Sequence, residues 1–213
     1  FGVSHCLFHS CTGRCSPTGS GHGYTIPKSA TTSAMPHLSK ETRLSLPAHW
    51  YYDPEHYRRE LESIWFRDWV CVGRTDALAR TGDYSTVTIA DQSLIVTRDD
   101  DDAIRAWHNV CRHRGSLLCS TESGRFRNGR IICPYHTWTY GLDGRLLATP
   151  GRVESADFRA SDLSLLPVHT ATWNRFVFVN LAEQPGTDLP AFLGDEANVL
   201  ANWPLADLRT VHA

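Results

Sequence analysis

The sequence lacks the features that mark several large classes of protein. No apolar run approaches the roughly 18 residues that a transmembrane helix needs. Neither sign of charge dominates, since 21 Lys and Arg face 23 Asp and Glu and the formal net charge is −2. We therefore expect neither nucleic acid nor a membrane as a partner. Hydrophobic residues make up 41% of the 213 positions and charged residues 21%, which is a globular composition.

Methionine is nearly absent, and the single Met stands at position 35. Residues 1–34 contain no Asp or Glu and show neither a helical nor a strand period. They also lack the basic and apolar regions of a secretory signal. Two interpretations stay open for this irregular leader: a disordered or targeting extension, or read-through upstream of a natural start at Met35. We leave it out of the fold prediction.

Cysteine is too sparse for a secreted disulfide scaffold. Of the seven cysteines, Cys6, Cys11 and Cys15 lie in the leader, where the nearby His5 and His9 resemble a metal cluster only by chance composition. Four cysteines in the rest of the chain favour a reducing, cytoplasmic compartment and thiolate ligands. They are Cys71, Cys111, Cys119 and Cys133.

One helix and a series of short strands are predicted after residue 46. Asp53 followed by Pro54 is a typical helix start, and apolar residues then recur at three- and four-residue steps, which predicts a helix over 53–65. A second helix is predicted over 189–200, capped by Asp188. The period of two predicts strands at 69–72, 84–89, 94–97, 103–110, 130–132, 138–140 and 145–148, and a strand pair or bent strand at 168–181.

Three turns are expected between these strands. Asn128-Gly129 and Asp143-Gly144 are strong hairpin-turn signals. The acidic run 99–102 lacks the Gly and the distal Glu of a calcium loop, so we interpret it as a solvated hairpin tip.

Two Cys/His pairs carry the chemistry of the sequence. Cys111 and His113 have the spacing C-x-H, Cys133 and His136 have C-x-x-H, and 19 residues separate the pairs. Each pair lies at the tip of a predicted hairpin. Two chemistries fit two thiolates and two imidazoles: a structural zinc, or a Rieske [2Fe–2S] cluster with both Cys on one iron and both His on the other.

The residues flanking the pairs resemble the two cluster loops of Rieske proteins. The first loop reads Cys-Arg-His-Arg-Gly and the second Cys-Pro-Tyr-His-Thr-Trp. Respiratory Rieske proteins carry a further Cys in each loop, but here Tyr135 occupies that place in the second loop, which is typical of the oxygenase and ferredoxin branch. The resemblance implies that six residues surround the cluster: Arg112, Arg114, Gly115, Pro134, Tyr135 and Trp138.

A longer stretch, from Trp50 to about Leu181, is similar to the N-terminal part of the large (alpha) subunit of Rieske non-haem iron oxygenases. The 19-residue gap and His-Thr-Trp-Thr-Tyr resemble the group that acts on choline and glycine betaine. The resemblance implies a mainly β fold: an antiparallel Rieske domain with an N-terminal helix, followed by the start of a truncated α+β catalytic domain. The expected division is 1–34 leader, 35–67 extension and helix, 68–150 Rieske domain, 151–165 connector and 166–213 catalytic domain.

The family's oxygen chemistry takes place at a mononuclear Fe(II) held by two His and a carboxylate in a C-terminal domain. After His136 only His169 and His212 remain, and neither belongs to a closely spaced pair, so no catalytic residue is expected in this chain. We expect it to accept electrons from a flavin reductase or ferredoxin, and the full-length protein to form a homotrimer. The resemblance implies an aromatic compound or a quaternary amine as the substrate of the full-length protein. The chain alone is expected to show no substrate-dependent oxygen uptake.

Two other functions stay open on the sequence. A stand-alone Rieske ferredoxin would carry electrons without belonging to an enzyme, although ferredoxins end soon after the second loop and 77 residues follow His136 here. A zinc-stapled binding module would have no redox chemistry at all.

Overall fold

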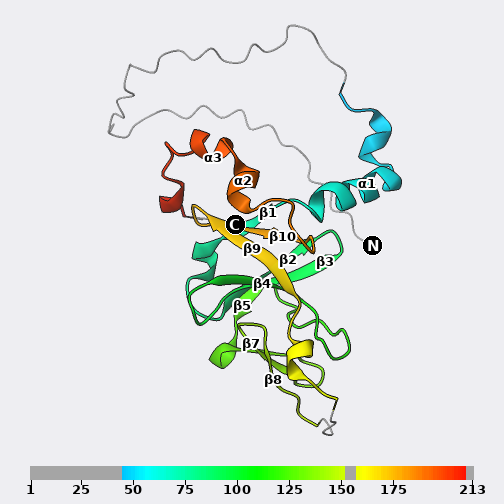
Figure 1. Ribbon diagram of the computed structural model, residues 1–213, viewed down its shortest axis with the longest axis vertical. Coiled ribbons are helices and arrows are strands. Elements are labelled where there is room, and N and C mark those ends of the chain that lie inside the picture. The colour runs from blue at the N-terminus through cyan, green and yellow to red at the C-terminus, as the bar shows by residue number, and fades with distance from the viewer. Residues whose placement is uncertain (1–44, 152–156, 210–213) are drawn as a thin grey trace, which may run out of the picture. The chain divides into compact units, whose positions relative to one another are not determined.

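The computed structural model describes residues 45–151 and 157–209 (Figure 1). The leader with its three cysteines, Met35, His212 and part of the predicted connector lie outside the described residues. Every element below belongs to the unit formed by Leu46–Ala213.

The N-terminal helix begins where the sequence predicts. After a short 3-10 turn, η1 (Ala48–Tyr51), Asp53 caps α1 (Pro54–Glu60) by accepting a hydrogen bond from the Glu55 N–H at 2.9 Å. The predicted helix is confirmed to Trp65, but its last turn, η2 (Leu61–Trp65), is a π-helix. Its hydrogen bonds span five residues, as from Phe66 N–H to Leu61 C=O at 2.9 Å.

The larger of two sheets is antiparallel and has seven strands (Figure 1). The sequence prediction missed β5, because its three residues are all exposed and show no apolar alternation. The order across the sheet is β1 (Val70–Arg74), β10 (Phe176–Asn180), β9 (Pro167–Trp173), β4 (Ile104–His108), β3 (Gln92–Arg98), β2 (Asp83–Ile89) and β5 (Ser123–Arg125). The predicted strand pair at 168–181 is therefore confirmed as the hairpin β9–β10. Both strands join the same sheet as β1 to β4, so the sheet has no break at the predicted boundary near residue 166.

A second, three-stranded sheet consists of β6 (Arg130–Ile132), β7 (Thr139–Gly141) and β8 (Leu146–Ala148). Asp143-Gly144 forms the predicted hairpin turn between β7 and β8. The predicted hairpin at Asn128-Gly129 is wrong. Both residues adopt the expected positive φ, at 53° and 63°, but they lie at the end of the 3-10 turn η4 (Arg127–Gly129), which links strands of different sheets.

The second predicted helix is two short pieces. Asp188 caps α2 (Leu189–Leu193) by accepting a hydrogen bond from the Ala191 N–H at 2.9 Å, and α3 (Glu196–Val199) follows after a break at Gly194. The remaining 3-10 turns are η3 (Thr75–Leu78), η5 (Ala160–Leu163) and η6 (Leu205–Asp207). In the described part of the chain, no helix has the length and apolar character needed to cross a membrane.

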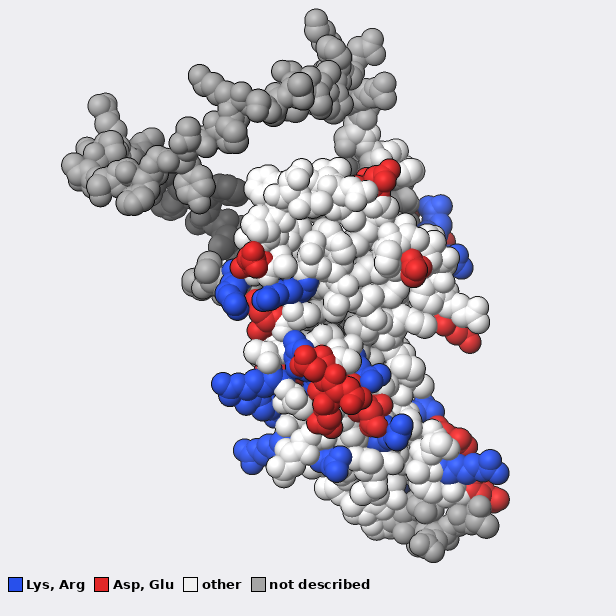
Figure 2. Space-filling model, turned by 60° about the vertical axis from the view of Figure 1, so that its left-hand side comes forward, with Lys and Arg blue, Asp and Glu red and all other residues white. Residues whose placement is uncertain are grey.

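The buried apolar side chains form two clusters. The sheet core lies within the seven-stranded sheet and includes Leu94, Val177 and Val179. The loop core includes Cys111, Cys133, Trp138 and Tyr140, and lies around the two Cys/His loops. The apolar strand β10 is therefore covered, whereas Phe192 and Val199 of α2 and α3 are exposed. Figure 2 shows few charged side chains on the part of the surface nearest these two helices.

The acidic run is a β3–β4 hairpin tip with a structural role. Asp99 is buried, and its Oδ1 accepts hydrogen bonds from the Asp101 and Ala103 N–H groups at 2.9 and 2.8 Å. Its other oxygen pairs with Arg105. Although burial alone would raise the pKa of Asp99, these hydrogen bonds hold it below the usual range. Only the residues after Asp99 are the solvated tip that the sequence predicts. In the middle of the face drawn in Figure 2, acidic side chains gather beside basic ones.

Candidate metal centre

The first Cys/His loop follows β4 and is closed by a single bridge between Val110 and Leu117. Two backbone hydrogen bonds turn the chain: Cys111 N–H donates to Ser116 C=O at 2.8 Å, and Gly115 N–H donates to Cys111 C=O at 3.0 Å. Gly115 has a φ of +68°, which suits a residue without Cβ.

The second loop connects the paired strands β6 and β7. Its closing hydrogen bonds repeat the pattern of the first: Cys133 N–H donates to Trp138 C=O at 2.8 Å, and Thr137 N–H donates to Cys133 C=O at 3.0 Å. In both loops the cysteine therefore stands at the start of a tight turn, and the histidine lies within that turn.

The two thiols are buried together. Cys111 is 2% exposed and Cys133 1%. Both belong to the same cluster of buried side chains. The Tyr140 hydroxyl lies 3.4 Å from Cys111 Sγ and accepts a hydrogen bond from the Arg112 N–H at 3.1 Å. Tyr140 thus bridges from β7, beside the second loop, to the first loop.

The electrostatic setting differs between the two thiols. Burial raises the pKa of Cys111. Burial acts in the same direction on Cys133, but the backbone N–H groups of Tyr135 and His136 outweigh it and lower the pKa of that thiol. Backbone donors aimed at a sulfur are the surroundings in which a thiolate is stable.

The two imidazoles lie side by side on the outer side of the thiols. The ring centroids of His113 and His136 are 4.8 Å apart at an angle of 71°. Trp138 stacks on His113 at 4.7 Å and 10°, and Tyr135 lies 3.8 Å from His136. His113 is exposed, and its pKa is lowered by partial desolvation and by the charges of His136 and Arg114. Nδ1 of His136 is buried and has no hydrogen-bond partner among the described residues.

These donors fit a [2Fe–2S] cluster better than a zinc ion. A tetrahedral zinc needs four donors aimed at one point. Within residues 45–151 and 157–209, no three His, Cys, Asp or Glu side chains converge in that way. The four donors are instead divided into a buried thiol pair and an outer imidazole pair, as a cluster with two irons requires. The orphaned Nδ1 of His136 is a free donor atom in this arrangement.

Cys71, Cys119 and His169 lie among the described residues and outside the proposed donor set. Cys119 is buried, and burial raises its pKa to about 11, so it stays a neutral thiol. Cys71 is exposed on β1. His169 is exposed on β9, where its Nε2 lies 3.1 Å from the Glu183 carbonyl oxygen.

The residues expected around the cluster differ in their exposure and in their hydrogen bonds. Arg112 donates from Nη2 to the Asp162 carbonyl oxygen at 3.4 Å, while its Nε is buried without a partner among the described residues. Arg114 and Pro134 are exposed. Neither arginine forms an ion pair among the described residues, so both leave positive charge next to the site.

Sequence reasoning missed Tyr140 and Asn109. Tyr140 is fully buried and, two residues after Trp138, lies on the same side of its strand, so the period of two could have indicated it. Asn109 is buried at the end of β4 and is hydrogen-bonded to residues 10 and 16 positions away. No local sequence pattern predicts hydrogen bonds between residues so far apart in the chain.

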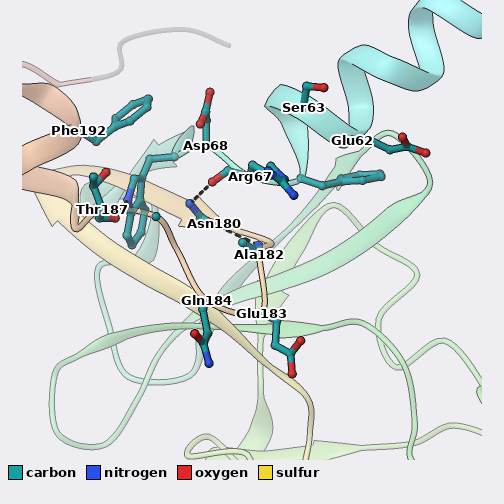
Figure 3. A pocket seen from close by; sticks show the side chains of 13 residues that line it. Glu62, Ser63, Arg67, Asp68, Asn180, Ala182, Glu183, Gln184, Thr187 and Phe192 are labelled. Atoms are coloured by element: carbon teal, nitrogen blue, oxygen red, sulfur yellow. Dashed lines mark hydrogen bonds between the residues drawn. The ribbon is translucent and has the colours of Figure 1, made fainter.

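A wide cleft in the described unit is not part of this site. It has a volume of about 1210 Å³ and lies between the end of η2 and the segment after β10. Figure 3 shows Asn180 joining its two sides, through hydrogen bonds to the Arg67 carbonyl oxygen at 2.7 Å and from the Ala182 N–H at 2.9 Å. The cleft has no Cys or His in its lining, and it is the metal-ligand chemistry of the loops that identifies the site.

Comparison with known proteins matches the segment that contains both loops. Residues 68–169 match the family described as the Rieske [2Fe-2S] domain. The glycine betaine monooxygenase oxygenase subunit of Chromohalobacter salexigens is 40% identical over 165 residues, which cover 78% of this chain and 36% of that protein. The chain thus spans about a third of the length of this relative.

Solved structures give two further similarities. The apo form of the quaternary ammonium Rieske monooxygenase CntA has a TM-score of 0.68 at 31% identity, covering 73% of this chain and 45% of that one. Naphthalene 1,2-dioxygenase from Rhodococcus sp. has a TM-score of 0.67 at 32% identity, covering 72% and 35%. The shared fold therefore extends across oxygenases with different substrates.

Proposed function

Because the chain belongs to the Rieske [2Fe–2S] domain family, in the form found in oxygenase alpha subunits, we propose that Cys111, His113, Cys133 and His136 hold its cluster. The two cysteines would bind one iron and the two histidines the other. The observation that carries this proposal is the division of the donors into a buried thiol pair and an outer imidazole pair. Residues 68–150 contain all four ligands, and we propose them as the cluster domain.

When bound, the cluster accepts and releases one electron at a time, within a range of about −150 to +300 mV for Rieske centres. The surrounding side chains prepare the site for this exchange. The rings of Trp138 and Tyr135 pack against the two imidazoles and help to hold them in place. Arg112 and Arg114 add positive charge, which favours the electron-rich state. The exposed edge of His113 gives an electron partner a short path to the site.

At the level of the whole protein, we propose an oxygenase alpha subunit that receives electrons from a flavin reductase or ferredoxin. It would pass them to a mononuclear iron for O2-dependent hydroxylation or demethylation. Two similarities support a quaternary amine as the substrate class: the 40% identity to a glycine betaine monooxygenase oxygenase subunit, and the structural match to a quaternary ammonium monooxygenase. The match to a naphthalene dioxygenase makes an aromatic substrate the alternative.

The ligand set is tested by iron and acid-labile sulfide analysis of the 213-residue chain, combined with visible absorption and electron paramagnetic resonance (EPR) after one-electron reduction. We expect about two irons and two sulfides per chain, since that is the composition of the cluster. Cys111→Ser and His136→Ala should each abolish the visible bands and the EPR signal.

Matched variants outside the ligand set serve as controls. Cys119→Ser removes a third buried thiol from the loop core. His169→Ala removes an exposed imidazole from β9. Both variants should keep the cluster. Stoichiometric zinc without visible absorption would overturn the proposal and favour a zinc-stapled module. A cluster that survives Cys111→Ser but is lost in Cys119→Ser would overturn the ligand assignment.

A further inference from the structure

Asn109 is a buried amide just outside the first Cys/His loop, at 3% exposure. Its Nδ2 donates to the Cys119 carbonyl oxygen at 2.8 Å and to Ser93 Oγ at 3.1 Å. Its Oδ1 accepts from the Cys119 and Leu118 N–H groups at 2.9 and 3.1 Å. An asparagine amide offers two donors and two lone pairs, so all of its hydrogen-bonding capacity is used.

These bonds join the two ends of the first loop. Asn109 precedes the loop and its partners Leu118 and Cys119 follow it, so the side chain closes the segment 110–117 that contains Cys111 and His113. The backbone N–H of Asn109 also donates to the Ser93 carbonyl oxygen at 2.8 Å. Ser93 lies on β3, inside the seven-stranded sheet, so the closure is anchored to the most extensively paired part of the fold.

The two loops differ in what else holds them closed. The second loop is flanked by β6 and β7, which pair through three residues on each side. The strand after the first loop, β5, pairs with β2 and not with β4. Among the described residues, the first loop therefore has a single bridge, between Val110 and Leu117, where the second loop has a strand ladder. The side-chain hydrogen bonds of Asn109 thus close the first loop, as the backbone hydrogen bonds between β6 and β7 close the second.

We infer that Asn109 is a positioning residue for the cluster, which fixes the closure of the first loop and thereby the placement of Cys111 and His113. The inference rests on the ligand set proposed above. Loss of the amide leaves the N–H and C=O groups of Cys119 without their partner and frees the loop to open. Residues that orient metal ligands typically change metal affinity by about 10- to 100-fold when they are replaced.

The experiment compares Asn109→Ala with Asn180→Ala in the full 213-residue chain. Asn180 is a matched control because it is 2% exposed and its amide is also hydrogen-bonded to the backbone, at the Arg67 carbonyl oxygen and the Ala182 N–H. Both variants should unfold more easily in the apo form. Only Asn109→Ala should shorten the half-life of the visible absorption in a chelator, by about tenfold or more, and change the EPR line shape.

Ser93→Ala provides a milder variant that removes one of the four bonds and keeps the rest. It should shift the half-life in the same direction as Asn109→Ala, but less, and it carries the test if Asn109→Ala does not fold. If the wild-type chain binds the cluster, and Asn109→Ala and Ser93→Ala both keep the wild-type half-life and EPR signal, the inference is overturned and the proposed function is not. A wild-type chain without a [2Fe–2S] cluster would refute the proposed function, and the inference with it.

Discussion

At the scale of single residues, Tyr140 places a hydroxyl group next to the sulfur of Cys111. Its hydroxyl oxygen accepts the Arg112 N–H, which leaves the hydroxyl hydrogen free to be donated to Cys111 Sγ at 3.4 Å. Burial and the neighbouring Cys111 raise the pKa of Tyr140, so the hydroxyl keeps its proton over the working pH range. Because the loops contain no second pair of cysteines, the hydrogen bonds of this side chain are a cross-link between them.

Tyr140→Phe is expected to lower the midpoint potential of the cluster. A hydrogen bond to the sulfur stabilises the reduced, more negative state, and one such bond of about 0.5–1.5 kcal/mol corresponds to about 20–60 mV for one electron. The measurement is a redox titration followed by visible absorption. Tyr84→Phe is the control, since it removes a hydroxyl that is hydrogen-bonded to Thr121 Oγ1 at 2.8 Å, and it should leave the potential unchanged. Equal potentials for wild type and Tyr140→Phe would contradict the proposed hydrogen bond.

At the scale of secondary-structure elements, the contact between β4 and the β7–β8 turn links the two sheets. Gly144 in that turn has a φ of +80°, and a Cβ added to it would lie 2.5 Å from the Trp107 ring. Trp107 is buried in the loop core together with Cys111 and Cys133. The close approach of this ring to the turn backbone therefore places the three-stranded sheet against the seven-stranded one.

Gly144→Ala is expected to destabilise the fold by about 2–4 kcal/mol, because it adds the strain of a positive φ to overpacking against the Trp107 ring. Gly151→Ala separates the two costs. Gly151 has a similar φ of +74°, but nothing lies within 4 Å of an added Cβ, so only the backbone cost of about 1–2 kcal/mol applies. Urea denaturation followed by tryptophan fluorescence measures both. Equal losses in the two variants would show that the Trp107 contact contributes nothing.

At the scale of the described unit, the two apolar clusters have different sources of stability. The sheet core is held by the seven-residue strands β2, β3 and β9 and their neighbours. The loop core contains the two cysteines proposed as ligands among its buried residues, next to a sheet whose strands have three residues each. Metal binding to residues inside a small core adds its binding free energy to the stability of that core.

Removal of the cluster should therefore raise the rate of amide hydrogen exchange more in the loop core than in the sheet core. In the apo chain, amides of β6, β7 and the two loops should exchange faster than in the loaded chain, because local opening of the loop core becomes easier. Amides of β3 and β4 should keep their protection. Hydrogen–deuterium exchange of both forms, read by mass spectrometry, gives the comparison. Uniform acceleration across both sheets would mean that the clusters unfold together.

The local sequence pattern predicted most of the elements because their signals are local. The Asp53-Pro54 start of the helix, the Asp143-Gly144 turn and the apolar alternation of the strands act within a few residues. Errors occurred where a distant partner decides the outcome. Asn128-Gly129 has the backbone of a hairpin turn, yet the strands on its two sides pair with different sheets. The three-residue strand β5 exists only because β2 is there to pair with it.

The sequence by itself determined the chemistry of the candidate site, because C-x-H and C-x-x-H with their flanking residues specify donor types and spacing along the chain. Only the tertiary structure decided how those donors are arranged. The separation into inner thiols and outer imidazoles, the reach of Tyr140 to Cys111 and the closure of the first loop by Asn109 all join segments that are distant in sequence. Such contacts form because folding brings a buried polar group to the one partner that can satisfy it, and no pattern of neighbouring residues records which partner that is.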